Sequence, residues 1–414
     1  MGNKKTPEVQ FLGFTGGWKQ KPLTELVERV IRKNNKLEST LPLTISAQNG
    51  LVDQETFFNK KVASTNLQGY YLLYKGEFAY NKSYSNGYPF GAVKRLEKYD
   101  KGVLSSLYIC FRPLNSGTSD FLKHYFESTA WHKEVSMISV EGARNHGLLN
   151  ISVNDFFETL HTTPTLEEQK KIGDFFKQLD DTIALYQQEL TTLKQTKQGF
   201  LQKMFPKEGE SVPEVRFPGF TGDWEQRKLG ELIEISSAAR VHKNEWTTSG
   251  VRFFRSSDVV SKFNGKENIP AFISFSLYDE LSKKSGLVQP GDILVTGGGS
   301  IGIPYLVADQ EPLYFKDADL IWLKSANKID GNFLYSYFVT PQLRKYISSI
   351  THIGTISHYT IEQAKDTPII LPEQVEQTLI GNFFKQLNDT ITLHQRELDA
   401  LKETKKAFLQ KMFV

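Results

Sequence analysis

Two groups of polar and cationic residues occur in stretches that read as loops, one group in each half of the chain. Arginine and lysine donate to guanine, side-chain amides pair with adenine, and small hydroxyls contact phosphate. Loops rich in these side chains are typical of a surface that contacts nucleic acid. In the first half the candidates are Asn81, Lys82, Tyr84, Lys94, Arg95, Arg144, Asn145 and His146. In the second half they are Arg240, His242, Arg252, Arg255, Ser256, Ser257, Ser300, His352, Ser357 and His358.

The sequence does not carry a spacing that indicates catalysis. The glycine-rich run at residues 297–302 reads GGGSIG and lacks both the Walker lysine and the dinucleotide-binding spacing. An Asn-Pro-Pro-aromatic methyltransferase motif and a zinc-ligand spacing are also missing from the sequence. Cys110 is the single cysteine, which rules out an intramolecular disulfide and a cysteine-cluster metal site. We therefore expect no catalytic centre and no metal site, and we interpret the glycine-rich run as a loop that approaches a phosphate backbone.

Length and composition indicate an ordinary globular protein with more than one domain. The chain has 414 residues, of which 39% are hydrophobic and 23% charged, which suits two domains plus spacers. The formal net charge is only +3, so nucleic-acid binding would have to rest on local clusters of charge. Uninterrupted apolar stretches long enough to span a membrane are missing from the sequence, and we expect a cytoplasmic protein.

Two segments of the chain occur twice. The lead segments, residues 7–23 and 213–229, read PEVQFLGFTGGWKQKPL and PEVRFPGFTGDWEQRKL. Residues 173–205 and 381–413 repeat at most positions, and both end in FLQKMF. The intervening regions, 24–160 and 230–368, share almost no identity. Repeated flanking segments with unlike regions between them indicate one scaffold that carries two different recognition domains. The alternative is an old duplication whose middle regions drifted.

The repeated C-terminal segments predict two long helices with an apolar seam. Apolar residues recur in a 4-3 pattern without proline over more than four heptads of each copy. Each helix of about 33 residues would be about 50 Å long. One such helix cannot bury its stripe alone, so we expect the two copies to pair antiparallel; the alternative is a homodimer through the same seam. The expected helix–helix seam is Phe176, Leu179, Ile183, Leu190, Leu193, Phe384, Leu387, Ile391, Leu398 and Leu401.

The two unlike regions nevertheless follow one order of turns, strands and helices. Both contain a helix N-cap pattern, at Ser152 and at Thr360, and both reach their long helix through a proline followed by Glu-Gln. We therefore expect an α+β protein: two similar α/β domains and two long antiparallel coiled-coil helices, related by a pseudo-two-fold repeat. The expected boundaries are 1–163 for the first domain, 164–206 for the central helix, 207–371 for the second domain and 372–414 for the C-terminal helix.

The repeated motifs resemble those of the specificity subunits of type I restriction–modification systems, of the staphylococcal type. The resemblance covers nearly the whole chain and is most specific in the FLQKMF helix ends, the F-x-G-F-T-G-x-W lead segments and the Pro…Glu-Gln junctions. It implies two target recognition domains that each read half of a bipartite site in double-stranded DNA, with helices that set the gap.

The resemblance also implies partners that carry the chemistry. Two modification subunits would bind S-adenosylmethionine and methylate adenine, and further restriction subunits would use ATP and Mg²⁺ for translocation and cleavage. The chain itself would be non-catalytic and would bind no cofactor directly. Two alternatives remain at this point, namely a self-sufficient DNA methyltransferase or nuclease, and an interaction scaffold without a DNA function.

Overall fold

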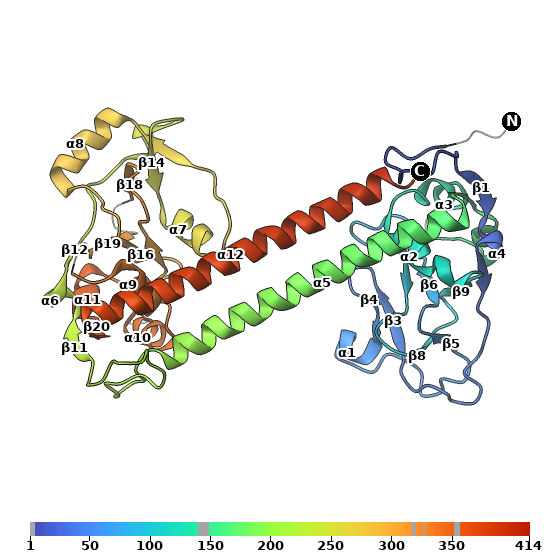
Figure 1. Ribbon diagram of the computed structural model, residues 1–414, viewed down its shortest axis with the longest axis horizontal. Coiled ribbons are helices and arrows are strands. Elements are labelled where there is room, and N and C mark those ends of the chain that lie inside the picture. Colours follow the sequence, from blue (N-terminus) through green and yellow to red (C-terminus); the bar gives the residue numbers. More distant parts are fainter. Residues whose placement is uncertain (1–4, 140–148, 317–319, 326–327, 352–356) are drawn as a thin grey trace. The chain divides into compact units, whose positions relative to one another are not determined.

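The computed structural model describes residues 5–139, 149–316, 320–325, 328–351 and 357–414 (Figure 1). The chain divides into two compact units, residues 1–186 with 398–414 and residues 187–397. Each long helix therefore contributes one half to each unit. Among the described residues, no helix combines the length and the apolar character needed to cross a membrane.

The first unit is built on a four-stranded antiparallel sheet in the order β2-β9-β6-β7. Its strands are β2 (Val27–Arg29), β6 (Phe78–Asn81), β7 (Ala92–Arg95) and β9 (Ile109–Pro113). Two further pairs join β3 (Leu43–Ser46) to β4 (Gly50–Asp53) and β5 (Tyr71–Tyr74) to β8 (Lys101–Leu104). The short helices are α1 (Gln54–Phe58), α2 (Ser119–Glu127), α3 (His132–Ile138) and α4 (Val153–Glu158), with 3-10 turns η1 (Leu23–Glu25) and η2 (Ser116–Thr118).

The second unit contains two four-stranded sheets. One is antiparallel, in the order β12 (Glu234–Ser236), β19 (Leu320–Lys324), β16 (Ile293–Thr296) and β17 (Pro304–Leu306). The other is mixed, in the order β13 (Trp246–Thr247), β15 (Ala271–Ile273), β14 (Val251–Phe254) and β18 (Leu313–Phe315). The helices are α6 (Leu229–Leu232), α7 (Ser256–Phe263), α8 (Phe275–Ser285), α9 (Gly331–Phe338), α10 (Pro341–Thr351) and α11 (Ile361–Asp366), with the 3-10 turn η3 (Lys243–Glu245).

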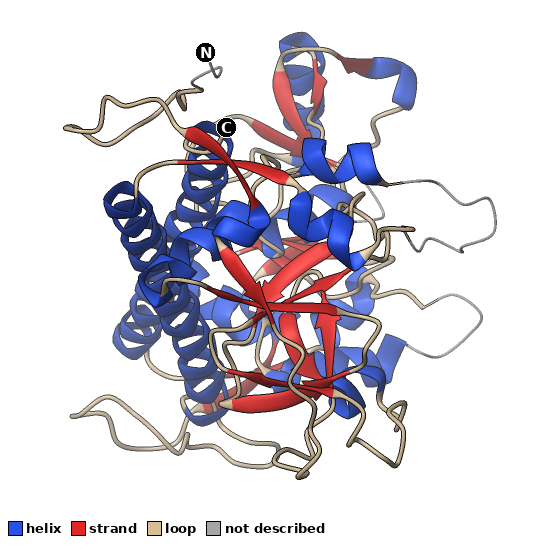
Figure 2. Ribbon diagram, turned by 90° about the vertical axis from the view of Figure 1, so that its right-hand side faces the viewer, coloured by secondary structure: helices blue, strands red, loops and turns tan. Residues whose placement is uncertain are grey.

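The two units share one framework and differ in what is inserted into it. In both antiparallel sheets the first strand in sequence pairs with the last, and the last pairs with the first strand of a hairpin. The inserts fall at the same two places but form two separate strand pairs in the first unit and one mixed sheet in the second. Strands coloured red in Figure 2 lie in such short sheets linked by long loops. The prediction of one fold used twice is thereby confirmed.

The long helices α5 (Leu166–Lys203) and α12 (Gln374–Lys411) each follow a strand that pairs with a lead segment. These pairs are β1 (Lys19–Pro22) with β10 (Leu160–Thr163), and β11 (Glu225–Lys228) with β20 (Pro368–Leu371), both antiparallel. Both predicted N-caps are confirmed, because the Ser152 and Thr360 hydroxyls accept hydrogen bonds from the backbone amides three residues later, at 3.0 and 3.2 Å.

The FLQKMF end of α12 inserts its last phenylalanine into the core of the first unit. The Phe413 ring lies 6.4 Å from Trp18, 5.6 Å from Phe121, 5.9 Å from Tyr125 and 5.7 Å from Phe176, measured between ring centroids. Trp18 belongs to the first lead segment and Phe176 to α5, so one ring joins three separate parts of the sequence. Aromatic side chains of this size dominate the burial energy of a core.

The end of α5 repeats this arrangement in the second unit. Phe205 lies 6.1 Å from Trp224, 5.6 Å from Phe333, 5.8 Å from Tyr337 and 5.8 Å from Phe384. Each of these four rings stands at the repeat position of its counterpart in the first unit. The repeated motifs are therefore the residues that bind each long helix into the unit at its far end.

Backbone hydrogen bonds also join the lead segments to the helix ends. The Val9 amide donates to the Lys411 carbonyl at 3.1 Å, and the Val215 amide donates to the Lys203 carbonyl at 2.8 Å. The last carbonyls of a helix have no partner within it, so these bonds satisfy groups that would otherwise need water.

Buried glutamates hold the lead segments to the helix starts. Glu168 accepts from the Gln10 amide at 2.8 Å, and Glu376 forms a two-pronged pair with the Arg216 guanidinium at 2.7 Å. These glutamates belong to the Glu-Gln pairs of the sequence, and only the second has a cationic partner here. Both ends of each lead segment are thus fixed by residues that the repeat retains.

Within each unit the two helix halves run antiparallel. Phe175 packs on Phe408 in the first unit at 5.1 Å, and Phe200 packs on Phe383 in the second at 5.0 Å. Of the expected seam, Phe176, Leu190, Phe384 and Leu398 are buried. Leu179, Ile183, Leu193, Leu387, Ile391 and Leu401 are only partly covered. A pair of helices leaves one side of its apolar stripe open, since each helix offers the other only a narrow contact.

A lysine on the seam has carboxylate partners in the first unit. The Lys405 ammonium lies 2.6 Å from Asp180 and 2.8 Å from Glu127. Asp180 also receives Lys123 at 2.9 Å and the His124 ring at 3.0 Å. Burial disfavours the charged form of Asp180, but these donors outweigh burial and hold its pKa well below the ordinary value.

The described residues of the second unit do not repeat this cluster. Lys197 stands at the repeat position of Lys405, and Asn388 stands where the first helix has Asp180. Among the described residues Lys197 has no ion pair, and burial lowers its pKa. The two seams therefore match in apolar packing and differ in charge.

Replacing either terminal phenylalanine should loosen one unit and spare the other. Phe413→Ala leaves a cavity among four rings and should cost about 3–5 kcal/mol in the first unit, with the second unit unchanged. Phe205→Ala should give the reverse pattern. Hydrogen exchange of the full chain, read separately for residues 27–139 and 234–351, measures both. Equal loss of protection in both units from either variant would contradict independent anchoring.

Exchanging the two residues at the unlike seam position should move stability in opposite directions. Asp180→Asn should destabilise the first unit by roughly 2 kcal/mol at neutral pH, because Lys405 and Lys123 lose a shared carboxylate. Asn388→Asp should stabilise the second unit by on the order of 1 kcal/mol, because Lys197 gains a partner.

These effects should also depend on pH with a defined sign. A carboxylate whose pKa is depressed by folding contributes stability above its unfolded pKa, about 3.9, and loses it as the pH falls below that value. Urea unfolding of wild type and Asp180→Asn from pH 7 to pH 3 should therefore show full separation at pH 7 that shrinks below about pH 4. A separation that is constant over this range would exclude the ion cluster as its source.

Candidate nucleic-acid interface

Three candidate residues lie at the hairpin loop that follows β6 in the first unit. Two of them, Asn81 and Lys82, form hydrogen bonds within the unit, and the third, Tyr84, is exposed. The Asn81 side-chain oxygen accepts from the Ser83 amide at 3.1 Å. The Lys82 ammonium donates to the Ile151 carbonyl at 2.9 Å, which joins this loop to the segment before α4. Tyr84 is 60% exposed. The loop is therefore held at its base while its aromatic side chain projects into solvent.

Lys94 and Arg95, on β7, are engaged within the first unit. The Arg95 guanidinium lies 2.8 Å from Asp120 and 2.8 Å from Glu97. Burial lowers the pKa of Lys94, whose ammonium lies 5.5 Å from the centroid of the Tyr88 ring. These two cations therefore contribute to internal packing and pairing, and any contact with an outside anion would compete with those interactions.

A buried aspartate organises two arginines in the second unit. Asp258, 1% exposed, accepts from the Arg255 Nε at 2.7 Å and Nη2 at 3.1 Å, and from the Arg252 Nη2 at 3.3 Å. Arg255 also donates to the Ile269 carbonyl at 2.7 Å. Both arginine side chains remain about a quarter exposed. The corner between β14 and α7 thus fixes two cations in orientation before any ligand arrives.

Hydrogen bonds from Thr296 and Arg344 hold the glycine-rich loop of the second unit in one conformation. The Thr296 hydroxyl donates to the Ser300 carbonyl and accepts from the Ile303 amide. The Arg344 guanidinium of α10 donates to the Gly302 carbonyl at 2.6 Å, and burial lowers the pKa of this arginine. Ser300 itself is exposed. The loop therefore has a defined shape, and the sequence interpretation of it as a phosphate-facing loop stays a prediction.

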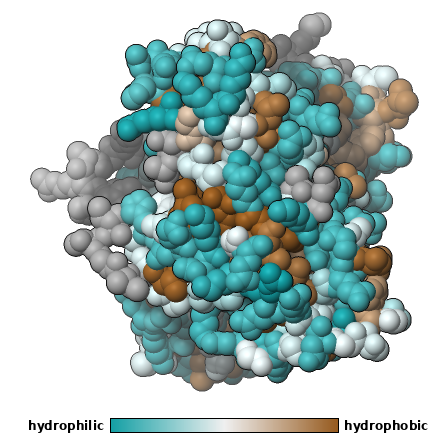
Figure 3. Space-filling model, turned by 90° about the vertical axis from the view of Figure 1, so that its left-hand side faces the viewer, coloured by the Kyte–Doolittle hydropathy of each residue, from teal (hydrophilic) through white to brown (hydrophobic). Residues whose placement is uncertain are grey.

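The remaining candidates are scattered over the surface of the second unit. Arg240, His242, Ser257 and His358 are exposed, and Ser256 and Ser357 are partly covered. The Ser257 hydroxyl accepts from the Asn268 amide at 3.1 Å. Arg144, Asn145, His146 and His352 lie outside the described residues. The face in Figure 3 is largely hydrophilic, with hydrophobic residues gathered towards its middle.

Sequence reasoning missed Asp258 and Arg344, which position other candidates. The sequence does contain a signal for Asp258, because Arg255 to Asp258 has the spacing of a helix N-cap and its third residue. Arg344 lies inside an amphipathic helix and carries no comparable signal. The described residues include no cluster of three or more histidine, cysteine or carboxylate side chains that could hold a metal ion. The arrangement thus offers fixed cations, amides and hydroxyls that can donate and accept hydrogen bonds to a ligand.

Known proteins resemble this chain in sequence and in fold. The type I restriction enzyme MjaVIII specificity subunit of Methanocaldococcus jannaschii is 25% identical over 324 residues, which are 75% of this chain and 73% of that protein. A putative type I restriction enzyme specificity subunit of Haemophilus influenzae is 28% identical over 170 residues, 40% of this chain and 41% of that protein. The crystal structure of the type I restriction–modification S subunit from M. genitalium covers 99% of both chains, with a TM-score of 0.61 and 16% identity.

The model of one protein family matches the chain twice. The type I restriction modification DNA specificity domain covers residues 16–195 and 221–403. Each match runs from a lead segment through one variable region into a long helix, which is the repeat unit defined above. This chain belongs to the family of type I restriction–modification DNA specificity subunits, and it carries two target recognition domains.

Proposed function

We propose that this chain is the non-catalytic DNA reader of a type I restriction–modification complex. Each target recognition domain binds one half of a bipartite site in double-stranded DNA, and the long helices set the gap between the halves. The observation that carries the proposal is the division of each unit into a shared framework and an unlike insert. A protein that places two domains in the same framework, but recognises a different DNA sequence with each, needs a shared framework and unlike inserts.

The position of the candidate contacts supports this function. The corner held by Asp258 lies at the junction of β14 and α7, inside the insert of the second unit. The repeated residues, by contrast, are used in the helix anchors and the lead segments. Arginine presented in a fixed orientation is suited to a bidentate contact with a guanine edge or with phosphate. Recognition in this proposal therefore depends on residues that the repeat does not conserve.

Chemistry is supplied by partners in this proposal. Two modification subunits bind S-adenosylmethionine and methylate adenine, and restriction subunits bind ATP and Mg²⁺. The partly covered helix seam supports a docking role for the helices, as do two exposed leucines at equivalent repeat positions, Leu185 at 53% and Leu393 at 54% exposure. Exposed apolar side chains on a helix favour contact with another protein surface.

Exchanging one variable region should change one half of the methylated site. Residues 24–160 are replaced by the same region of another specificity subunit, and the chain is expressed with its modification partner. Genome-wide mapping of methylated adenine should show a new first half-site and an unchanged second half-site. The matched exchange of residues 230–368 should alter only the other half. If either exchange altered both halves, the two readers would not be independent.

Loosening the two organised arginines should weaken reading of one half-site only. Asp258→Asn removes the charge that orients Arg252 and Arg255, and a lost bidentate base contact costs about 1–3 kcal/mol. The affinity for the full site should therefore fall by about 5- to 150-fold. Changed bases should become better tolerated in one half-site and not in the other. Glu280→Gln, which removes an exposed partner of Lys284 on α8, is the matched control and should leave binding unchanged. Equal loss of discrimination in both halves would contradict this role for Asp258.

A further inference from the structure

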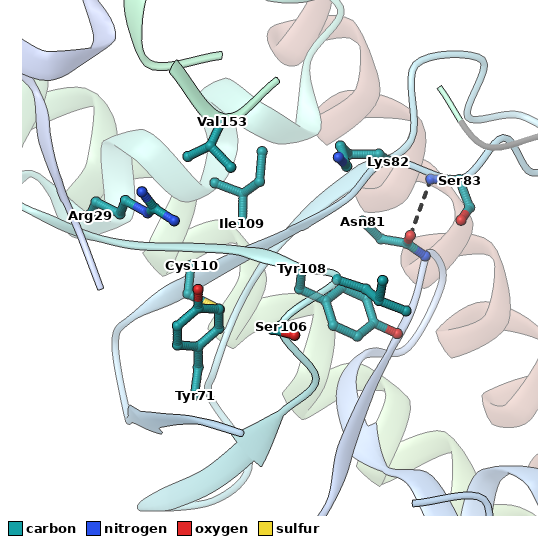
Figure 4. A pocket seen from close by; sticks show the side chains of 11 residues that line it. Arg29, Tyr71, Asn81, Lys82, Ser83, Ser106, Tyr108, Ile109, Cys110 and Val153 are labelled. Atoms are coloured by element: carbon teal, nitrogen blue, oxygen red, sulfur yellow. Dashed lines mark hydrogen bonds between the residues drawn. The ribbon is translucent and has the colours of Figure 1, made fainter. Parts of the chain in front are cut away.

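A cavity of about 300 Å³ opens in the first unit beside the hairpin loop. It is lined by the end of β2, by β5, by the end of β6 and the loop after it, by the turn between β8 and β9, by the start of β9, and by α4 (Figure 4). None of its residues belongs to a lead segment or to a long helix. The cavity therefore lies within the variable region of the first unit, which shares almost no identity with the corresponding region of the second.

Several polar groups at this cavity have no partner among the described residues. The Asn81 side-chain oxygen is taken by the Ser83 amide, shown dashed in Figure 4, but its NH₂ group is uncommitted. The Arg29 guanidinium forms no ion pair within the described chain and is exposed. The Ser106 hydroxyl is likewise uncommitted. By contrast, the Lys82 ammonium is used by the Ile151 carbonyl.

Besides these polar and cationic groups, the cavity is lined by two aromatic side chains and by a buried neutral patch. The Lys33 ammonium lies 3.8 Å from the centroid of the Tyr71 ring, so one face of that ring is already covered. Tyr71 and Tyr108 both line it, and the Tyr108 hydroxyl is fixed near Thr44 at 3.3 Å. Cys110 and Ile109 form part of its buried surface. Burial raises the pKa of the Cys110 thiol to about 12, so this wall is neutral at physiological pH. The cavity thus combines aromatic and buried apolar surface with hydrogen-bond donors.

This combination matches one nucleobase. A base is planar, with two apolar faces that stack on aromatic rings and one edge that forms hydrogen bonds. The volume is at the lower end of the range for ligand pockets, about 300–1,000 Å³, which suits a ligand as small as one base. The uncommitted groups include an NH₂ group and a guanidinium, so an acceptor-rich edge is favoured. Guanine, with its N7 and O6 acceptors, is the base that arginine recognises most often.

An exposed leucine at the mouth indicates where the base comes from. Leu107 lies in the turn closed by the hydrogen bond from the Tyr108 amide to the Ser105 carbonyl, and its side chain is 77% exposed. Apolar side chains inserted between base steps unstack the duplex, and a base that leaves the stack needs a pocket to receive it. At this cavity a wedge and a receiving pocket stand next to each other.

We propose that the cavity bounded by Arg29, Tyr71 and Tyr108 receives one unstacked guanine base, with Leu107 filling the space that the base leaves in bound DNA. The part of this inference that takes the base from bound DNA rests on the proposed DNA-reading function. The same cavity chemistry would also take the base of a free guanine nucleotide. The experiment below separates the two sources.

The test uses the full chain and its own mapped site. Each guanine of the first half-site is replaced in turn by a fluorescent guanine analogue that is quenched while stacked. Binding of wild type should raise the fluorescence of one position several-fold. Leu107→Ala and Asn81→Ala should each remove most of this increase, while overall affinity for the duplex falls by about 5- to 150-fold, since one base contact is worth about 1–3 kcal/mol. Leu12→Ala, which alters a fully exposed leucine of the first lead segment, is the control and should keep the full increase.

A second arm titrates the DNA-free chain with guanosine monophosphate and follows binding by calorimetry. Binding of this probe that Asn81→Ala abolishes would support the cavity with a free nucleotide as its source, even if DNA binding itself failed. Tight DNA binding with no fluorescence increase at any first-half guanine and no binding of guanosine monophosphate would overturn the inference and leave the DNA-reading function intact. An increase that persists in both variants would also overturn it, because the base would then enter another site.

Discussion

The insertion of one phenylalanine ring from each long helix into the core at its far end is the contact on which the architecture depends. Phe413 and Phe205 each pack on four aromatic rings, one of which is the tryptophan of a lead segment. These contacts join the two ends of a repeat that are far apart in the sequence. Without them a helix of this length would have an open apolar stripe and no fixed partner, because its isolated propensity is too weak to hold it.

The retained residues form one continuous set of contacts in each unit. Lead segment, helix start and helix end meet through the tryptophans, through the glutamates Glu168 and Glu376, and through the backbone bonds from Val9 and Val215. The variable regions contribute to this set the rings of Phe121 and Tyr125 in the first unit and of Phe333 and Tyr337 in the second, which stand at equivalent positions. The extra strands and loops outside this set can change without loosening it. This separation explains how one chain keeps two nearly identical frameworks while its two inserts have diverged into differently connected sheets.

Sequence patterns predicted what is local and repeated, and missed what depends on distant contacts. The heptad pattern and the N-caps at Ser152 and Thr360 are local, and they agree with the structure. The motifs FLQKMF and F-x-G-F-T-G-x-W were recognised as repeated, but nothing in either motif indicates that their aromatic residues meet. The candidate contacts were chosen by residue type alone, so Arg95, which is held by Asp120, could not be told apart from an exposed arginine such as Arg240. The cavity beside Asn81 is lined by residues from several strands, turns and one helix that lie far apart in the sequence, and no periodicity encodes it.

The two repeats differ in charge at one equivalent seam position, which is Asp180 in the first repeat and Asn388 in the second. In antiparallel pairing, the residue at position 180 faces the seam lysine of the opposite helix. A symmetric pair of first repeats would match aspartate with Lys197 at both ends, whereas a symmetric pair of second repeats would match asparagine with Lys405 at both ends. The first repeat is therefore self-complementary in charge and the second is not. The mixed pair within one chain combines one charged and one uncharged seam position, so the single change of a carboxylate to an amide distinguishes its two ends.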